Sequence, residues 1–181
     1  MKPAMLATVL ALVIGNTAAV TAQIKPPPPS APGPTVGTVW VSSQGGAIPP
    51  GAVATGYEPG GFLYSCRALI QGGGTHPGKV RPGFTGCYVP IGGRETSVRQ
   101  YEVFTGDLAW AVARDGTIPE GAVEAGRTPT GQNLYVCRAA AAPGQLQPGK
   151  TGAGLRGCNV GVGGNEQTLA MYEVLVRRRQ M

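Results

Sequence analysis

The sequence predicts an all-β protein made of two tandem repeats of short antiparallel strands. Positions 40–61 and 63–104 recur 70 and then 71 positions later, with 29 identities in 64 aligned positions, which is far above chance. The chain has 30 glycines and 17 prolines in 181 residues, and both residue types disfavour helices. Short apolar runs alternate with turn residues, and no long run has a helical period.

The N-terminal segment is predicted to lie outside the repeats. Residues 1–22 contain one basic residue, an apolar run and a small-residue end, which is typical of a secretory signal. The apolar run is too short to span a membrane, so we expect a secreted or periplasmic protein without a membrane span. The proline-rich residues 23–37 are predicted to form an extended linker.

The two repeats are assigned to residues 38–106 and 107–176, and a basic tail follows at 177–181. In the first repeat the alternation of apolar and polar residues predicts strands at 62–68, 87–91 and 101–104. One copy of such short strands buries little surface. We therefore expect the copies to pack face to face around a pseudo-two-fold axis and to share one core.

Four cysteines lie at equivalent positions of the two repeats. Cys66 and Cys87 are 21 positions apart, and so are Cys137 and Cys158. The duplication favours one bridge within each repeat, and an oxidising compartment would let these bridges form. Three connectivities are formally open, including an exchange between the repeats. The wide spacing is unlike that of a zinc site, so we predict no metal.

Catalysis has few candidate residues in this chain. His76 is the only histidine, and its place in a glycine-rich loop predicts a solvated side chain. There is no nucleophile elbow and no metal-ligand spacing, so we predict a protein that is not an enzyme and needs no cofactor. The net charge of +6 permits weak attraction to acidic surfaces, but it selects no partner by itself, and no nucleic-acid partner is predicted.

A Pro-Gly-Lys motif places Lys79 and Lys150 at equivalent positions, in what the sequence predicts to be a tight turn. An ammonium that donates to vicinal hydroxyl groups and a carboxylate that accepts from them are typical of sugar recognition, and Glu58 could supply that carboxylate. The alternative is that both lysines only solubilise a turn.

Read in order, these motifs and their second set resemble the DM-nine repeat family over about residues 38–176. The residues that carry the resemblance in the first copy are Trp40, Gly46-Ala47-Ile48-Pro49, Ala52-Val53, Gly56, Leu63-Tyr64, Arg67-Ala68, Pro77-Gly78-Lys79, Gly92-Gly93, Glu95 and Tyr101-Glu102-Val103. That family includes secreted and immune-related proteins, the N-terminal part of natterin-type toxins and a lectin that binds mannose. The resemblance implies an all-β tandem fold and monosaccharide binding.

The resemblance also implies which residues contact the sugar. In the mannose-binding members an aspartate of a Gly-x-Asp segment and the lysine of Pro-Gly-Lys are contacts. Here Glu58 takes the place of the aspartate and Lys79 matches directly. The second repeat keeps Lys150 but has Thr128 where the carboxylate belongs, so its site is expected to be weaker.

Three functional hypotheses follow from the sequence. The first is a non-catalytic, mannose-type carbohydrate-binding protein that uses Glu58, Lys79 and Lys150. The second is an envelope-associated structural or protein-interaction module without a small ligand, and the third is an uncharacterised hydrolase. A homodimer is compatible with the first two. Arg67 and Arg138 are expected to pair across strands with the recurring glutamates at 95, 102, 166 and 173, and both tryptophans are expected to pack at the core or its rim.

Overall fold

A computed structural model describes residues 39–177 apart from 108 and 153. The predicted signal segment 1–22, the linker 23–37 and the tail after residue 177 lie outside these residues. The first repeat contributes β1 (Val39–Gln44), β2 (Ala54–Glu58), β3 (Gly61–Leu69), β4 (Thr75–Val80), β5 (Cys87–Ile91), β6 (Arg94–Val98) and β7 (Gln100–Thr105). The second contributes β8 (Ala109–Arg114), β9 (Glu124–Arg127), β10 (Asn133–Ala142), β11 (Gln145–Gly152), β12 (Cys158–Val162), β13 (Asn165–Leu169) and β14 (Met171–Val176).

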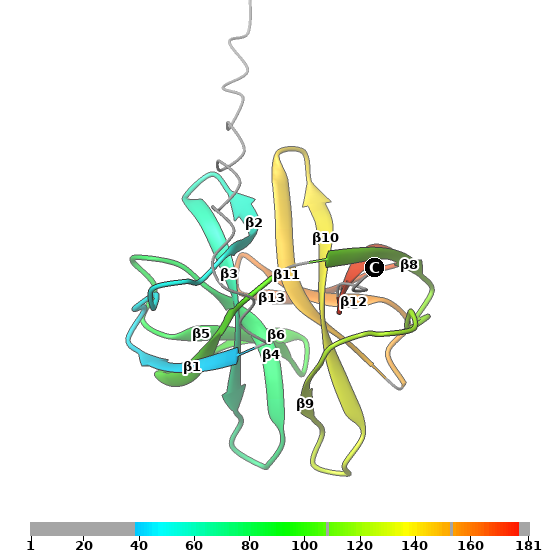
Figure 1. Cartoon of the computed structure of the whole chain (residues 1–181), viewed down its shortest axis with the longest axis horizontal. Coiled ribbons are helices and arrows are strands. Elements are labelled where there is room, and N and C mark those ends of the chain that lie inside the picture. Colours follow the sequence, from blue (N-terminus) through cyan, green and yellow to red (C-terminus); the bar gives the residue numbers. More distant parts are fainter. Residues whose placement is uncertain (1–38, 108, 153, 178–181) are drawn as a thin grey trace, which may run out of the picture.

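The predicted all-β tandem fold is confirmed, because the seven strands of each repeat correspond one to one. Each repeat is built on a long hairpin, β3–β4 in the first and β10–β11 in the second, and the two hairpins lie side by side (Figure 1). The described residues contain no helix with the length and apolar character that a membrane crossing requires.

Within the described residues three strand pairings join the repeats, and they are related by a pseudo-two-fold axis. Tyr57 in β2 pairs with Leu146 in β11, and at the equivalent positions Arg127 in β9 pairs with Thr75 in β4. The pairing of β6 with β13 joins two equivalent residues, 94 and 165, so the axis passes close to it. Each repeat therefore supplies a strand to the sheet of the other.

In the part of the chain that the structure describes, the core consists of three hydrophobic clusters. One lies within each repeat and includes that repeat's cysteines. The third is shared, because Phe104 of the first repeat packs with Val136 and Leu175 of the second. Trp40 and Trp110 pack against this shared cluster, as the sequence predicts. Long-range burial between the copies thus adds to a small core inside each copy.

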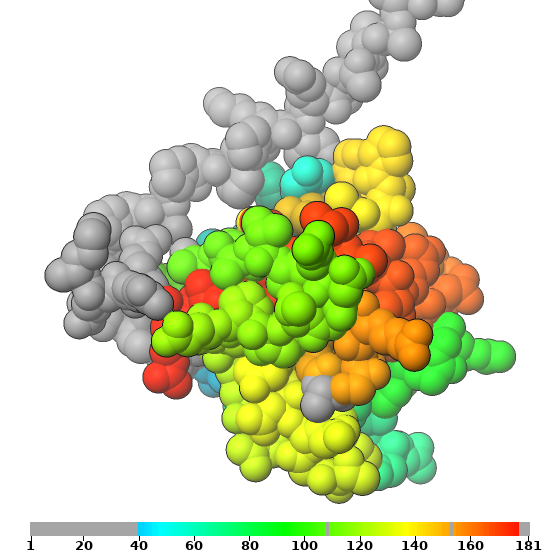
Figure 2. Space-filling view, turned by 90° about the vertical axis from the view of Figure 1, so that its right-hand side faces the viewer, coloured from blue at the N-terminus to red at the C-terminus, as the bar shows by residue number. Residues whose placement is uncertain are grey.

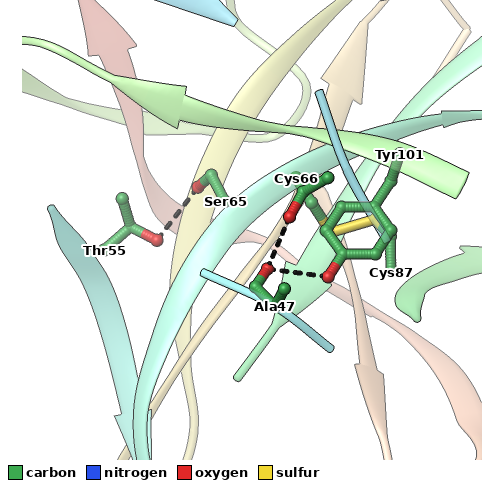
Figure 3. Close-up of a disulfide and its surroundings, with 7 residues drawn as sticks. Ala47, Thr55, Ser65, Cys66, Cys87 and Tyr101 are labelled. Carbon is green, nitrogen blue, oxygen red and sulfur yellow. Dashed lines mark hydrogen bonds between the residues drawn. A yellow bond between two sulfur atoms is a disulfide. The ribbon is translucent and has the colours of Figure 1, made fainter. Parts of the chain in front are cut away.

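Each repeat contains one disulfide, Cys66–Cys87 in the first and Cys137–Cys158 in the second, which is the pairing that the duplication favours. Beside the first bridge, the Tyr101 hydroxyl donates to the carbonyl of Ala47 at 2.8 Å (Figure 3). The equivalent tyrosine of the second repeat makes the same bond. Two disulfides are consistent with an oxidising compartment.

Candidate functional site

The predicted turn around Lys79 is wrong, because Pro77-Gly78-Lys79 lies inside β4. There Pro77 is opposite Arg67 of β3, and Lys79 is opposite Tyr88 of β5. A Cβ on Gly78 would overlap the carbonyl oxygen of Tyr88, so the glycine permits close strand approach and makes no turn. The strand carries the lysine into the interface between the repeats.

Lys79 is buried, with 3% of its surface exposed. Its ammonium donates to Gln147 Oε1 at 2.8 Å and to the carbonyl of Gly161 at 2.7 Å, both in the second repeat. Two carboxylates compensate its charge, since Glu95 Oε1 lies at 3.2 Å and Glu58 Oε2 at 3.7 Å. The two hydrogen bonds use two of the three N–H donors of the ammonium.

Glu58 lies at the end of β2 and is the more accessible member of this cluster. It accepts hydrogen bonds from Arg81 Nε at 2.8 Å and from Gln147 Nε2 at 3.1 Å. Burial by itself raises the pKa of Glu58, but the hydrogen bonds from Gln147 and Arg81 outweigh burial and hold the pKa below its usual range. The carboxylate is therefore ionised and fixed beside the lysine.

Lys150 occupies the equivalent place in the second repeat but has different partners. It lies in β11, and its Nζ is 3.2 Å from His76 Nδ1 and 4.0 Å from Glu166 Oε1. Burial lowers the pKa of Lys150 to about 8, and the Glu166 charge opposes this shift. The lysine is thus less well compensated than Lys79.

The prediction of a solvated His76 is wrong, because the side chain is 5% exposed in β4. Burial, aided by the charge of Lys150, lowers the pKa of His76 to about 4, although Glu166 acts in the opposite direction. The imidazole is neutral at physiological pH, and Nδ1 is the acceptor that faces the lysine ammonium. His76 and Gln147 are equivalent residues with the same role, because each accepts a hydrogen bond from the lysine of the other repeat.

Glu95 and Glu166 link the repeats across the axis. Glu95 Oε2 accepts from the amide of Gly164 and Glu166 Oε2 accepts from the amide of Gly93, both at 2.8 Å. The glutamates that pair with Arg67 and Arg138 are Glu102 and Glu173, each at 2.7 Å. Glu102 and Glu173 therefore pair with these arginines as expected, whereas Glu95 and Glu166 have other partners.

The structure brings Glu58 and Lys79 together with residues that the sequence analysis did not assign to the site. Gln147 and Glu95 belong to this group, whereas Glu166 lies beside Lys150, which the structure places apart from Glu58. The recurrence of the two glutamates beside Gly-Gly pairs was the available signal. Within the described residues Glu95 Oε1 is buried without a hydrogen-bond partner. A hydroxyl group could therefore accept from the third N–H of Lys79 and donate to a carboxylate. No group of residues suited to a metal ion is found in the described ranges.

Comparisons with known proteins agree with this architecture. Residues 58–169 match the model of the DM9 repeat family. A solved structure of the nematode sperm cell motility protein MFP2B is similar in fold, with a TM-score of 0.54 and 14% identity over 77% of this chain. The chain spans 44% of that protein's length. No curated protein matches the sequence.

Proposed function

The chain belongs to the DM9 repeat family, a β-rich type of binding module, and we propose that it binds carbohydrate at the Glu58–Lys79 cluster. One observation carries the proposal. The Lys79 ammonium has an N–H donor beyond its two hydrogen bonds, and it faces Glu58 across 3.7 Å, a separation that a hydroxyl group can bridge. A sugar hydroxyl can accept from Lys79 and donate to Glu58.

The neighbouring groups support recognition of two adjacent hydroxyls. Arg81 lies beside Glu58 with its side chain 25% exposed, so it offers further N–H donors at the solvent-exposed edge of the cluster. Glu95 Oε1 supplies an acceptor behind the ammonium. Mannose-type sugars present vicinal hydroxyls that would use such donors and acceptors, and the resemblance to mannose-binding members supports this choice of sugar.

The second repeat is proposed to hold a weaker site at Lys150. Thr128 has no carboxylate to offer, and the nearest carboxylate oxygen, Glu166 Oε1, is 4.0 Å from the ammonium. Asn159 also donates to this oxygen at 2.8 Å, so its capacity to accept from a ligand is partly used. The two lysines therefore differ in the ligand contacts available to them.

Isothermal titration of the full chain with mannose tests the proposal, with galactose, a stereoisomer that differs from mannose at C2 and C4, as the control. We expect saturable heat with mannose at millimolar concentration and a loss of that heat in Glu58→Gln, which keeps the size of the side chain. Glu173→Gln is the matched control, because it removes a carboxylate from an arginine pair far from the cluster in sequence and is expected to bind like wild type. Absence of heat in the folded wild-type protein would reject carbohydrate binding here.

A specific observation favours the second hypothesis, a protein-interaction module. Val112 in β8 and Met171 in β14 are 75% and 64% exposed, whereas Ser42 and Gln100 occupy the equivalent positions in the first repeat. Figure 2 shows the β8 segment, in light green, at the surface of the side that lies on the right in Figure 1. If no sugar binds, a change of oligomeric state in Val112→Glu, measured by light scattering, would support association of two copies through this side.

A further inference from the structure

A pocket of about 320 Å³ lies where the outer side of the first repeat meets strand β9 of the second repeat. Its lining residues are Arg67, Thr75, Glu102, Glu124, Gly126 and Arg127. Strands β4 and β9 can approach closely here because Gly126 has no side chain, and a Cβ at this position would overlap the carbonyl oxygen of Thr75. The pocket shares no residue with the Glu58–Lys79 cluster.

Two ion pairs line the pocket. Arg67 Nε lies 2.7 Å from Glu102 Oε2, and the guanidinium of Arg67 stacks on Trp40 at 4.6 Å from the ring centroid, which fixes its plane. Arg127 Nε lies 2.8 Å from Glu124 Oε1. Each pair uses one of the five N–H donors of a guanidinium and leaves the second carboxylate oxygen as a further acceptor.

We propose that this pocket binds a small zwitterion of the α-amino acid type. The carboxylate of such a ligand can accept from the guanidiniums of Arg67 and Arg127. Its ammonium has three donors, which match the oxygens of Glu102, Glu124 and the Thr75 hydroxyl. A simple anion would meet two carboxylates and a simple cation two guanidiniums, whereas a molecule with both charges satisfies all four groups.

The pseudo-symmetric face of the second repeat provides an internal comparison. Arg138 pairs with Glu173 at 2.7 Å and stacks on Trp110 at 4.0 Å, so the first half of the arrangement is present there too. The positions equivalent to Glu124 and Arg127 are Ala54 and Tyr57. The second ion pair is therefore missing, and we expect zwitterion binding only on the first face.

Titration of the full chain with L-alanine, L-glutamate and L-lysine, followed by NMR chemical shifts and calorimetry, tests the proposal. At least one of the three is expected to bind saturably at or below about 10 mM, an affinity in the weak range for small ligands. N-acetylation or amidation of that amino acid is expected to weaken binding at least about tenfold, because each removes a charge that the pocket pairs.

Arg127→Ala is the informative variant, because the side chain is 60% exposed and its loss does not disturb the core. We expect about tenfold weaker binding or more in this variant and unchanged binding in Arg156→Ala, which removes an exposed arginine outside the pocket. Glu102→Gln and Glu173→Gln form a second matched pair, of which only the first should weaken binding. Absence of binding by all three amino acids, equal binding of the acetylated form, or wild-type affinity in Arg127→Ala would each overturn the proposal.

Discussion

Lys150 of the second repeat faces His76 of the first, with Nζ and Nδ1 separated by 3.2 Å. At the equivalent place Lys79 donates to Gln147, so the duplication has kept the geometry and changed the acceptor. An amide does not titrate in the physiological range, whereas an imidazole does. The acceptor that faces Lys150 is therefore a group that acid can protonate, whereas the equivalent acceptor that faces Lys79 is not.

The first prediction concerns acid stability. The pKa of His76 is lowered to about 4 in the folded protein, from an ordinary value of 6.5. Between these values the unfolded chain binds more protons, so the free energy of unfolding falls as the pH drops from 6.5 towards 4. Lys150 and Glu166 are the charged groups that act on His76, and the repulsion from Lys150 reinforces the effect of burial.

His76→Gln replaces the histidine by the residue type that stands at the equivalent position 147. The new amide oxygen can accept from Lys150, as that of Gln147 accepts from Lys79. We expect the variant to fold and to lose the acid-linked decrease, which amounts to at most about 3 kcal/mol. Urea denaturation at several pH values between 4 and 7 measures it. If wild type and variant show the same pH dependence, the buried neutral histidine is not responsible.

The second prediction concerns alkaline pH and Lys150. Burial lowers the pKa of this lysine from 10.5 to about 8, so between these values the folded protein has released a proton that the unfolded chain keeps. The free energy of unfolding contributed by this residue therefore rises as the pH increases from 8 to 10.5. Lys150→Met should remove this rise, and denaturation of wild type and variant at pH 7.5 and 10 provides the comparison.

The third prediction is that the two lysines differ in their importance for stability. Lys79→Met would leave the buried Glu95 carboxylate without its nearest cation and would remove the donor of Gln147 Oε1 and the Gly161 carbonyl, at an expected cost of about 3–5 kcal/mol.

Lys150→Met should cost less, about 1–2 kcal/mol at neutral pH, because it leaves the buried His76 Nδ1 without its donor. Glu166 keeps its bonds from Asn159 and from the amide of Gly93, and the desolvation of the lysine is relieved. Chemical denaturation at pH 7 compares the two variants. Equal losses would contradict the unequal compensation described for the two sites.

The duplication made the all-β tandem fold, the disulfides and the packing of the tryptophans predictable, because these depend on local patterns that recur. The burial of Lys79 and His76 was not predictable in the same way. Pro77-Gly78 has the composition of a turn, and only the neighbouring strand β5 shows that Gly78 is needed for close approach. The acceptors of each lysine come from the other repeat, so no pattern within one copy identifies them.

The last prediction rests on carbohydrate binding and asks whether the missing carboxylate explains the weaker second site. Thr128 is the counterpart of Glu58, is half-buried, and follows β9 as Glu58 ends β2. Thr128→Glu would place a carboxylate near Lys150 and His76, where a sugar hydroxyl could donate to it and accept from the ammonium. Calorimetry should show the stoichiometry of mannose binding rise towards two per chain. Thr128→Gln, which has the same size but no charge, should keep the wild-type value, and a second site in both variants would show that the charge is not what the second repeat lacks.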